Sequence, residues 1–351
     1  MTTVPAAAEF ADQTLRQILH LHRGGSRLRL HLSNLFGKDP LTIGGLRIAR
    51  HLGGGRVEGG ADLGGLVIPV GESVVTEPVD FEIADDSELA VDLHVPGPTG
   101  LATYHPYALQ TGYLGDGDQR GAQRLPTKFF SLFWITGVDV VEADPAGRIV
   151  AFGDSLTDGG GSTHGAHRRF PDELSRRLGR PVLNLGIGGN RLLNDGFGEP
   201  GIVRFDRDVL GVPWVSHVLI ELGINDLGLP GRLGLPDKPD AARLIAGLTG
   251  LAERARAAGI RPILATLPPF RNADFPGYFS EESELTRAEV NTWIRGTGAV
   301  LDIAVALEEP GRAGFLNPEF DCGDHLHPND RGAHAMAHAI DTDVFEVPTP
   351  G

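Results

Sequence analysis

The sequence contains one cysteine, Cys322, in 351 residues, so no disulfide can form within the chain and an apolar core must hold the fold. It also lacks any run of Lys and Arg. The net charge of −15 argues against a nucleic acid as the main partner, because nucleic-acid-binding proteins usually present a basic surface. No stretch approaches the ~18 consecutive apolar residues that span a bilayer. We therefore expect no nucleic-acid partner and no membrane span.

The first residues, MTTVPAAAEFADQTLRQ, lack the basic segment and the following apolar segment of a secretory signal. The sequence as written therefore predicts a cytoplasmic protein, or a secreted one if a signal was removed ahead of this start. Apolar residues make up 41% of the chain, which is ample for a core, and 49 glycines and 25 prolines indicate many turns. No pattern in the sequence predicts an oligomeric state.

The two halves of the chain differ in pattern, which predicts an N-terminal domain over residues 1–143 and a second domain over 144–351. The front half contains short runs of alternating apolar and polar residues separated by Gly, Pro and Asp, typical of an antiparallel β-sandwich or jelly roll. Its runs TLRQILHLH and SRLRLHLSN, joined by RGG, predict a β-hairpin. The back half alternates five apolar strands with helices, which predicts a parallel sheet covered on both faces.

Polar and glycine-rich segments follow the predicted strands of the back half. GDS (153–155) follows the first strand, GIGGN (186–190) the second and GINDLG (223–228) the third, while DCGDHLHP (321–328) precedes the last helix. Ligands of a doubly wound parallel sheet bind beyond the carboxyl ends of its strands. We therefore expect these four segments to form one site.

The residues in these segments suit acyl transfer, which needs a nucleophile, a base and a group that orients the base. Ser155 is the candidate nucleophile, although a serine at a helix start can also be an N-cap. His327 is the candidate base and Asp324 its orienting carboxylate, with His325 as a competing base. A loop histidine can equally be a solvated side chain.

Acyl transfer also needs hydrogen-bond donors for the developing oxyanion. Gly189 can bring a backbone N–H close to a ligand, because it has no Cβ, and the Asn225 side chain can donate without carrying charge. Taken singly, GIGGN can be a tight turn and Asn225 can form an Asx turn. The joint occurrence of these residues after successive strands favours an oxyanion hole.

The motifs FGDSLTDG, NLGIGGN, ELGINDLG and DHLHP resemble, in order, those of the GDSL, or SGNH, hydrolase superfamily over residues 148 to 340. The resemblance implies a flavodoxin-like doubly wound catalytic domain with Ser155 as nucleophile and first oxyanion donor. It also implies Gly189 and Asn225 as the other oxyanion donors, and Asp324 and His327 as the rest of a catalytic triad. The family often has serine where this chain has Gly188. The front half resembles the β-rich N-terminal domain of two-domain members.

These observations predict a serine esterase that hydrolyses carboxylic esters and uses no metal or cofactor. The resemblance implies esters of small molecules or carbohydrates with short acyl chains such as acetyl groups. The loops 190–215 and 268–284 are the suspected substrate-binding segments, because they are long and carry aromatic side chains. Their aromatic residues are Phe197, Phe205, Phe270, Phe275, Tyr278 and Phe279.

Two alternatives keep the same site: an acyltransferase that passes the acyl group to an alcohol, and a deacetylase fused to a carbohydrate-binding module. A third interpretation is a metal site formed by Asp324, His325, His327 and Asp158, for which no further ligands stand at suitable spacing. A nucleotide-binding interpretation of GIGGN lacks the full Gly-x-Gly-x-x-Gly pattern.

Overall fold

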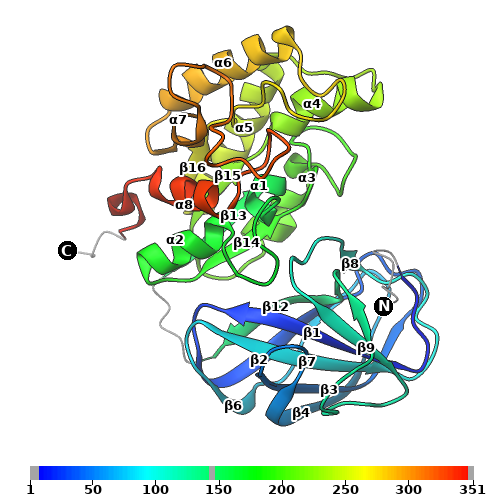
Figure 1. Cartoon of the computed structure of the whole chain (residues 1–351). Coiled ribbons are helices and arrows are strands. Elements are labelled where there is room, and N and C mark those ends of the chain that lie inside the picture. Colours follow the sequence, from blue (N-terminus) through cyan, green and yellow to red (C-terminus); the bar gives the residue numbers. More distant parts are fainter. Residues whose placement is uncertain (1–7, 142–146, 347–351) are drawn as a thin grey trace. The chain divides into compact units, whose positions relative to one another are not determined.

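The computed structural model describes residues 8–141 and 147–346. The chain divides into two compact units, Met1–Asp144 and Pro145–Gly351 (Figure 1). The predicted domain boundary between residues 143 and 144 lies outside the described residues and stays a prediction.

The N-terminal unit consists of antiparallel strands in two main sheets (Figure 1). The larger sheet has the order β10-β9-β1-β7-β3-β4, with the bounds Thr127–Phe129, Gly112–Asp116, Gln13–Leu21, Ser87–Val95, Leu41–His51 and Val57–Ile68. The smaller sheet joins β12 (Ile135–Val140), β2 (Gly25–Ser33), β5 (Ser73–Val75) and β6 (Val79–Ile83), and a separate short ladder pairs β8 (Tyr104–His105) with β11 (Leu132–Phe133). Side chains of both main sheets share one core cluster, so the predicted antiparallel β domain is confirmed.

The predicted hairpin between the first two strands is wrong. β1 pairs with β7 and β9 in the larger sheet, whereas β2 pairs with β12, β5 and β6 in the smaller one. The short link between β1 and β2 therefore crosses from one sheet to the other. The physical reason is burial: Leu15 of β1 and Leu28, Leu30 and Leu32 of β2 belong to the same core cluster, so the two apolar faces oppose each other.

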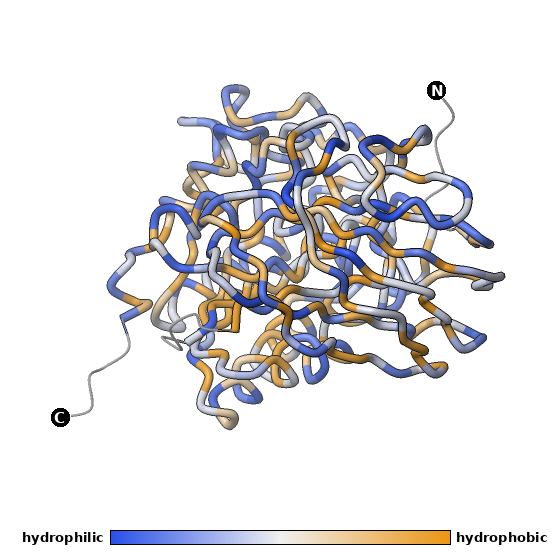
Figure 2. The backbone as a smooth tube through the Cα atoms, turned by 90° about the horizontal axis from the view of Figure 1, so that it is seen from below, coloured by the Kyte–Doolittle hydropathy of each residue, from blue (hydrophilic) through white to orange (hydrophobic). Residues whose placement is uncertain are grey.

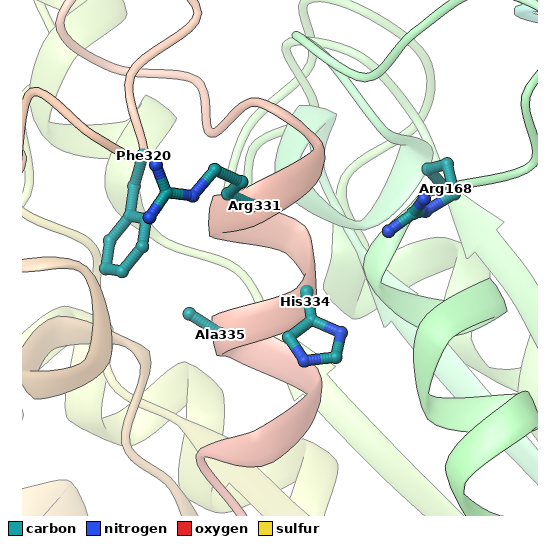
Figure 3. Close-up of a pocket in the computed structure, with 5 residues that line it drawn as sticks. All are labelled: Arg168, Phe320, Arg331, His334 and Ala335. Carbon is teal, nitrogen blue, oxygen red and sulfur yellow. The ribbon is translucent and has the colours of Figure 1, made fainter.

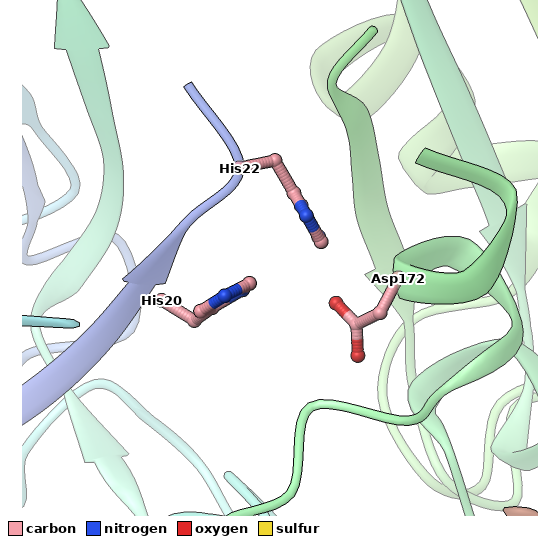
Figure 4. Close-up of side chains that lie close together, drawn as sticks. All are labelled: His20, His22 and Asp172. Atoms are coloured by element: carbon pink, nitrogen blue, oxygen red, sulfur yellow. The ribbon is translucent and has the colours of Figure 1, made fainter. Parts of the chain in front are cut away.

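β1 also contributes a charged group to the interior of the N-terminal unit. The Arg16 guanidinium is fully buried, donates to both carboxylate oxygens of Asp92 at 2.6 and 2.7 Å, and donates to the carbonyl of Gly55 at 2.7 Å. At the other end of the strand, the rings of His20 and His22 lie 4.5 Å apart and perpendicular (Figure 4). β1 thus carries a buried ion pair near its start and has two histidines at its other end.

The C-terminal unit has one five-stranded parallel sheet with the order β14-β13-β15-β16-β17 (Figure 1). In chain order the strands are β13 (Arg148–Gly153), β14 (Val182–Gly186), β15 (Val215–Glu221), β16 (Arg261–Ala265) and β17 (Val300–Leu301). This 2-1-3-4-5 order is that of flavodoxin-like folds, so the predicted fold class is confirmed. The strand order reverses between β13 and β15, which is where such sheets bind ligands.

Helices cover both faces of this sheet because residues of β13 alternate between the faces. Ile149 and Ala151 pack in a cluster with α2 (Phe170–Leu178), α7 (Ile303–Leu307) and α8 (Asp330–His338). Val150 and Phe152 pack on the other face against α3 (Gly201–Phe205), α5 (Ala241–Ala257) and α6 (Glu281–Arg295). Figure 2 shows the apolar stretches mostly inside and hydrophilic stretches at many outer loops.

Several short helices of the C-terminal unit were not predicted. The suspected loop 190–215 contains α3 and a π-helical turn, Asp206–Leu210, and GINDLGLPGRL forms α4 (Ile224–Leu233) despite Pro230 inside it. A 3-10 helix, Thr342–Phe345, ends the described chain. Asp172 caps the start of α2 by accepting from the backbone N–H of Arg169 at 3.0 Å (Figure 4). Within residues 8–141 and 147–346, no helix has the length and apolar character needed to cross a bilayer.

Candidate active site

Ser155 stands where β13 passes into α1 (Ser155–Asp158), a single helical turn. The N-cap of this turn is Asp154, whose carboxylate accepts from the backbone N–H of Leu156 at 3.1 Å. Ser155 therefore does not serve as the cap. Its hydroxyl points instead toward the loop before α8.

The structure brings Ser155, His327 and Asp324 into one hydrogen-bonded row. Nε2 of His327 lies 2.8 Å from Oγ of Ser155, and Nδ1 lies 2.6 Å from Oδ2 of Asp324. The other oxygen of Asp324 accepts the backbone N–H groups of Leu326 and His327 at 3.0 and 2.8 Å. Burial opposes the ionisation of Asp324, but the hydrogen bonds and charge of His327 outweigh it and hold the pKa of Asp324 below its ordinary value.

The three glycines that follow the serine motif allow this row to form. Gly159 ends α1 with a φ of 107°, a conformation that favours glycine. A Cβ at Gly160 would lie 2.8 Å from Cδ2 of the His327 ring, and a Cβ at Gly161 would lie 3.0 Å from the side chain of Cys322. The run GGG therefore lets the histidine loop approach Ser155 closely.

His325, considered above as a competing base, and Asp158, considered as a metal ligand, form other hydrogen bonds. The ring of His325 is exposed, and its Nδ1 lies 2.5 Å from a carboxylate oxygen of Asp321. The carboxylate of Asp158 accepts from the backbone N–H of Gly188 at 3.1 Å. Within the described residues, Asp158, Asp324, His325 and His327 do not form a cluster of ligand atoms.

Gly189 lies in the turn after β14 with a φ of 75°, and a Cβ there would contact the ring of Phe197 at about 2.7 Å. In the described part of the chain, neither the N–H of Gly189 nor that of Ser155 has a protein acceptor. Both N–H groups are therefore available to a ligand.

Asn225 lies in the first turn of α4, after β15, and is nearly fully buried. Its Nδ2 donates to the carbonyl of Asn190 at 3.1 Å, and its Oδ1 accepts from the hydroxyl of Tyr278 at 2.9 Å. The adjacent Asp226 accepts the backbone N–H groups of Leu192 and Leu193 at 2.6 and 3.0 Å. These bonds join the Asn225 turn to the segment that follows Gly189.

A buried arginine that sequence reasoning missed supports the same turns. Nη2 of Arg204 donates to the carbonyl of Gly153 at 2.8 Å, Nη1 to that of Leu185 at 3.0 Å, and Nε to Oδ1 of Asn190 at 3.0 Å. Its guanidinium also stacks on the Phe152 ring, 3.9 Å from the ring centroid. Arg204 thus connects the ends of β13 and β14 to the turn that follows Gly189.

Two buried carboxyl groups, those of Asp154 and Glu221, lie next to the Ser155 turn at the ends of β13 and β15. The sequence analysis did not predict this pair. The backbone N–H of Asp154 and the hydroxyl of Thr157 donate to one oxygen of Glu221, at 3.4 and 3.0 Å. Burial raises the pKa of Asp154 to about 7, and burial together with the charge of Asp154 raises the pKa of Glu221 well above its ordinary value. A glutamate at the end of the apolar run SHVLIEL is the sequence signal that could have revealed it.

The two suspected loops place some aromatic rings at the site and bury others. Phe197 is about half exposed and lies against Gly189, while the Phe275 ring lies edge-on to His327 with 6.2 Å between ring centroids. Phe205, Phe270 and Tyr278 are buried in the body of the unit. The loops are therefore anchored by some of their aromatic residues and line the site with others.

A separate open pocket of about 360 Å³ lies beside α8 (Figure 3). Its lining residues are Arg168, Phe320, Arg331, His334 and Ala335. Arg331 pairs with Glu319 at 3.0 Å, and both Arg168 and His334 pair with Glu173. Each basic side chain of this pocket therefore already contacts a carboxylate.

The flavodoxin-like sheet, with these strand-end segments at its switch point, defines a hydrolase of the SGNH fold. The model of the GDSL-like lipase/acylhydrolase family matches residues 151–335, which is more than half of the chain, and the protein belongs to this family. It is a carboxylic ester hydrolase. No curated protein matches the sequence.

Solved structures similar to part of the chain include three hydrolases. They are the lipase/acylhydrolase from Enterococcus faecalis (22% identity, 55% of this chain and 92% of that chain, TM-score 0.43), a GDSL-like lipase from Bacteroides thetaiotaomicron (19%, 57% and 89%, 0.44) and the M. smegmatis aryl esterase (16%, 55% and 95%, 0.44). The family assignment rests on the family model.

Proposed function

We propose that the protein hydrolyses carboxylic esters with short acyl chains through an acyl-enzyme on Ser155. Oγ of Ser155 attacks the ester carbonyl while its proton passes to Nε2 of His327, and the carboxylate of Asp324 holds the proton on Nδ1. His327 then gives its proton to the leaving alkoxide, and a water molecule releases the acyl group by the reverse sequence. The observation that carries this proposal is the 2.8 Å contact between Oγ of Ser155 and Nε2 of His327.

In this mechanism the developing oxyanion receives the N–H groups of Ser155 and Gly189 and one Nδ2 hydrogen of Asn225. The rings of Phe197 and Phe275 lie against Gly189 and beside His327, and we expect them to contact the acyl group and to favour a short one. Small acetyl esters, free or on a carbohydrate, are the substrates that we expect.

The test combines covalent labelling with a series of esters. A fluorophosphonate should add one adduct, measured by intact mass, and p-nitrophenyl acetate should be turned over faster than the butyrate and far faster than the decanoate. Ser155→Ala should lose both the adduct and the turnover. No adduct and no turnover in the wild type would refute the mechanism, and equal rates on acetate and decanoate would refute the short-chain preference.

A matched pair of histidine variants tests the assignment of the base. His327→Ala should lose turnover by several orders of magnitude, whereas His325→Ala should keep it, because the His325 ring faces Asp321 and not Ser155. The reverse pattern would assign the base to His325.

A further inference from the structure

Tyr278 lies in the loop 268–284, outside the motifs that identify the site, yet its hydroxyl contacts one of the proposed oxyanion donors. The side chain is 2% exposed, and its O–H donates to Oδ1 of Asn225 at 2.9 Å. On the other side of the amide, Nδ2 of Asn225 donates one hydrogen to the carbonyl of Asn190. The amide is thus held by a donor at its oxygen and an acceptor at its nitrogen.

We propose that Tyr278 is a positioning residue for catalysis, which holds the Asn225 amide so that the second Nδ2 hydrogen faces the oxyanion. This inference rests on the proposed role of Asn225. A buried amide oxygen without a donor costs free energy, so loss of the Tyr278 hydroxyl would favour other orientations of the amide. Preorganised donors stabilise a transition state because they need not reorient during the reaction.

The surroundings of Tyr278 keep its hydroxyl as a donor at this point. Burial and the nearby charges of Asp154 and Asp226 raise the pKa of Tyr278 well above its ordinary value, so the phenol keeps its proton. The ring contacts Phe270 edge-on, with 6.2 Å between centroids. It lies over Gly228 of α4, where a Cβ would overlap the ring.

The same loop is tied to the other half of the site. The backbone N–H of Asp274 donates to the carbonyl of Asp324 at 2.8 Å, and Phe275 lies beside His327. Residues 274–278 therefore contact the backbone of Asp324, the ring of His327 and the side-chain amide of Asn225. This arrangement explains how a loop residue could set the geometry of a strand-end asparagine.

A double-mutant cycle on the full chain tests the inference with p-nitrophenyl acetate. Asn225→Ala should lower kcat by ~10²–10³, the usual effect of losing one oxyanion donor. Tyr278→Phe should lower kcat about tenfold with little change in KM, the equivalent of one neutral hydrogen bond. In the Asn225→Ala background, Tyr278→Phe should change kcat by less than about twofold, because its effect passes through Asn225.

Two further variants separate positioning from general packing. Tyr113→Phe removes the hydroxyl of another buried tyrosine, in a core cluster of the N-terminal unit, and should leave kcat unchanged. Gly228→Ala should reproduce the kcat loss of Tyr278→Phe, because the added methyl displaces the ring, and should also be silent in the Asn225→Ala background.

The outcomes distinguish this inference from the proposed function. Wild-type kcat in Asn225→Ala would remove Asn225 from the oxyanion hole and with it the role of Tyr278, but would leave ester hydrolysis through Ser155 standing. An impaired Asn225→Ala with wild-type kcat in Tyr278→Phe would overturn only the role of Tyr278. Multiplicative losses in the double variant would also overturn it, since they would show that Tyr278 acts independently of Asn225.

Discussion

Replacement of Asp154 by asparagine should remove a defined pH dependence from the stability of the C-terminal unit. Asp154 and Glu221 are 0% and 1% exposed. Oδ2 of Asp154 and Oε1 of Glu221 have no hydrogen-bond partner among the described residues. Burial disfavours the ionised form of each carboxyl group and so raises the pKa of both. The folded protein therefore holds a proton here that the unfolded chain releases at a lower pH.

The magnitude follows from the pKa of Asp154, which burial raises from 3.8 to about 7. A raised pKa contributes stability that is fully present below about pH 4 and is lost as the pH rises through 7. At 1.36 kcal/mol per pKa unit, this single group lowers the free energy of unfolding by about 3 kcal/mol between pH 5 and pH 8. Asparagine keeps the cap on Leu156 through its amide oxygen and has no proton to lose.

The assay is urea unfolding of wild type and Asp154→Asn at pH 5, 6, 7 and 8. The stability of the variant relative to wild type should rise steadily with pH, by about 3 kcal/mol over the series. Asp195→Asn, which removes a carboxylate from an exposed position, makes the same change in net charge and should show no such trend. A difference between Asp154→Asn and wild type that is constant from pH 5 to pH 8 would refute the raised pKa of Asp154.

Three further predictions concern other parts of the chain. Asp92→Ala should destabilise the N-terminal unit by about 3–5 kcal/mol, because Arg16 stays buried without its partner, whereas Asp62→Ala, at a more exposed pair with Arg47, should cost less than about 1 kcal/mol in the same calorimetric scan. Gly160→Ala should lower turnover of p-nitrophenyl acetate by about 10²-fold through displacement of His327, while Gly250→Ala, where a Cβ meets open space, should not; equal turnover in both would exclude the steric role. The pH profile of kcat/KM should fall on the acid side with a slope of one proton, because His327 must be neutral and the pKa of Asp324 stays below its ordinary value; a slope of two would contradict this.

The strand-end rule explains why much of the candidate site could be predicted from sequence. The segments with Ser155, Gly189 and Asn225 each follow an apolar strand, and parallel strands bring their carboxyl ends to one edge of the sheet. The Asp-x-x-His spacing places Asp324 and His327 in one loop, where they do meet. The catalytic roles of these residues stay predictions.

Features that depend on partners distant in the chain could not be predicted in the same way. The alternation in β1 and β2 predicts strands correctly, but it cannot say that the two strands join opposite sheets. Tyr278 lies 53 residues from Asn225, and Arg204 lies 51 residues from Gly153, with no local pattern that links them. Their roles arise from packing, which a one-dimensional pattern does not encode.

The contact between Ser155 and His327 joins residues 172 positions apart, at the beginning and near the end of the C-terminal unit. Closing so long a loop costs conformational entropy, so we expect this contact to form after the intervening strands and helices have assembled. Recovery of fluorophosphonate labelling should therefore trail the recovery of helical signal when the denatured protein refolds. Labelling of Ser155 would therefore report when folding is complete, in addition to testing the proposed catalysis.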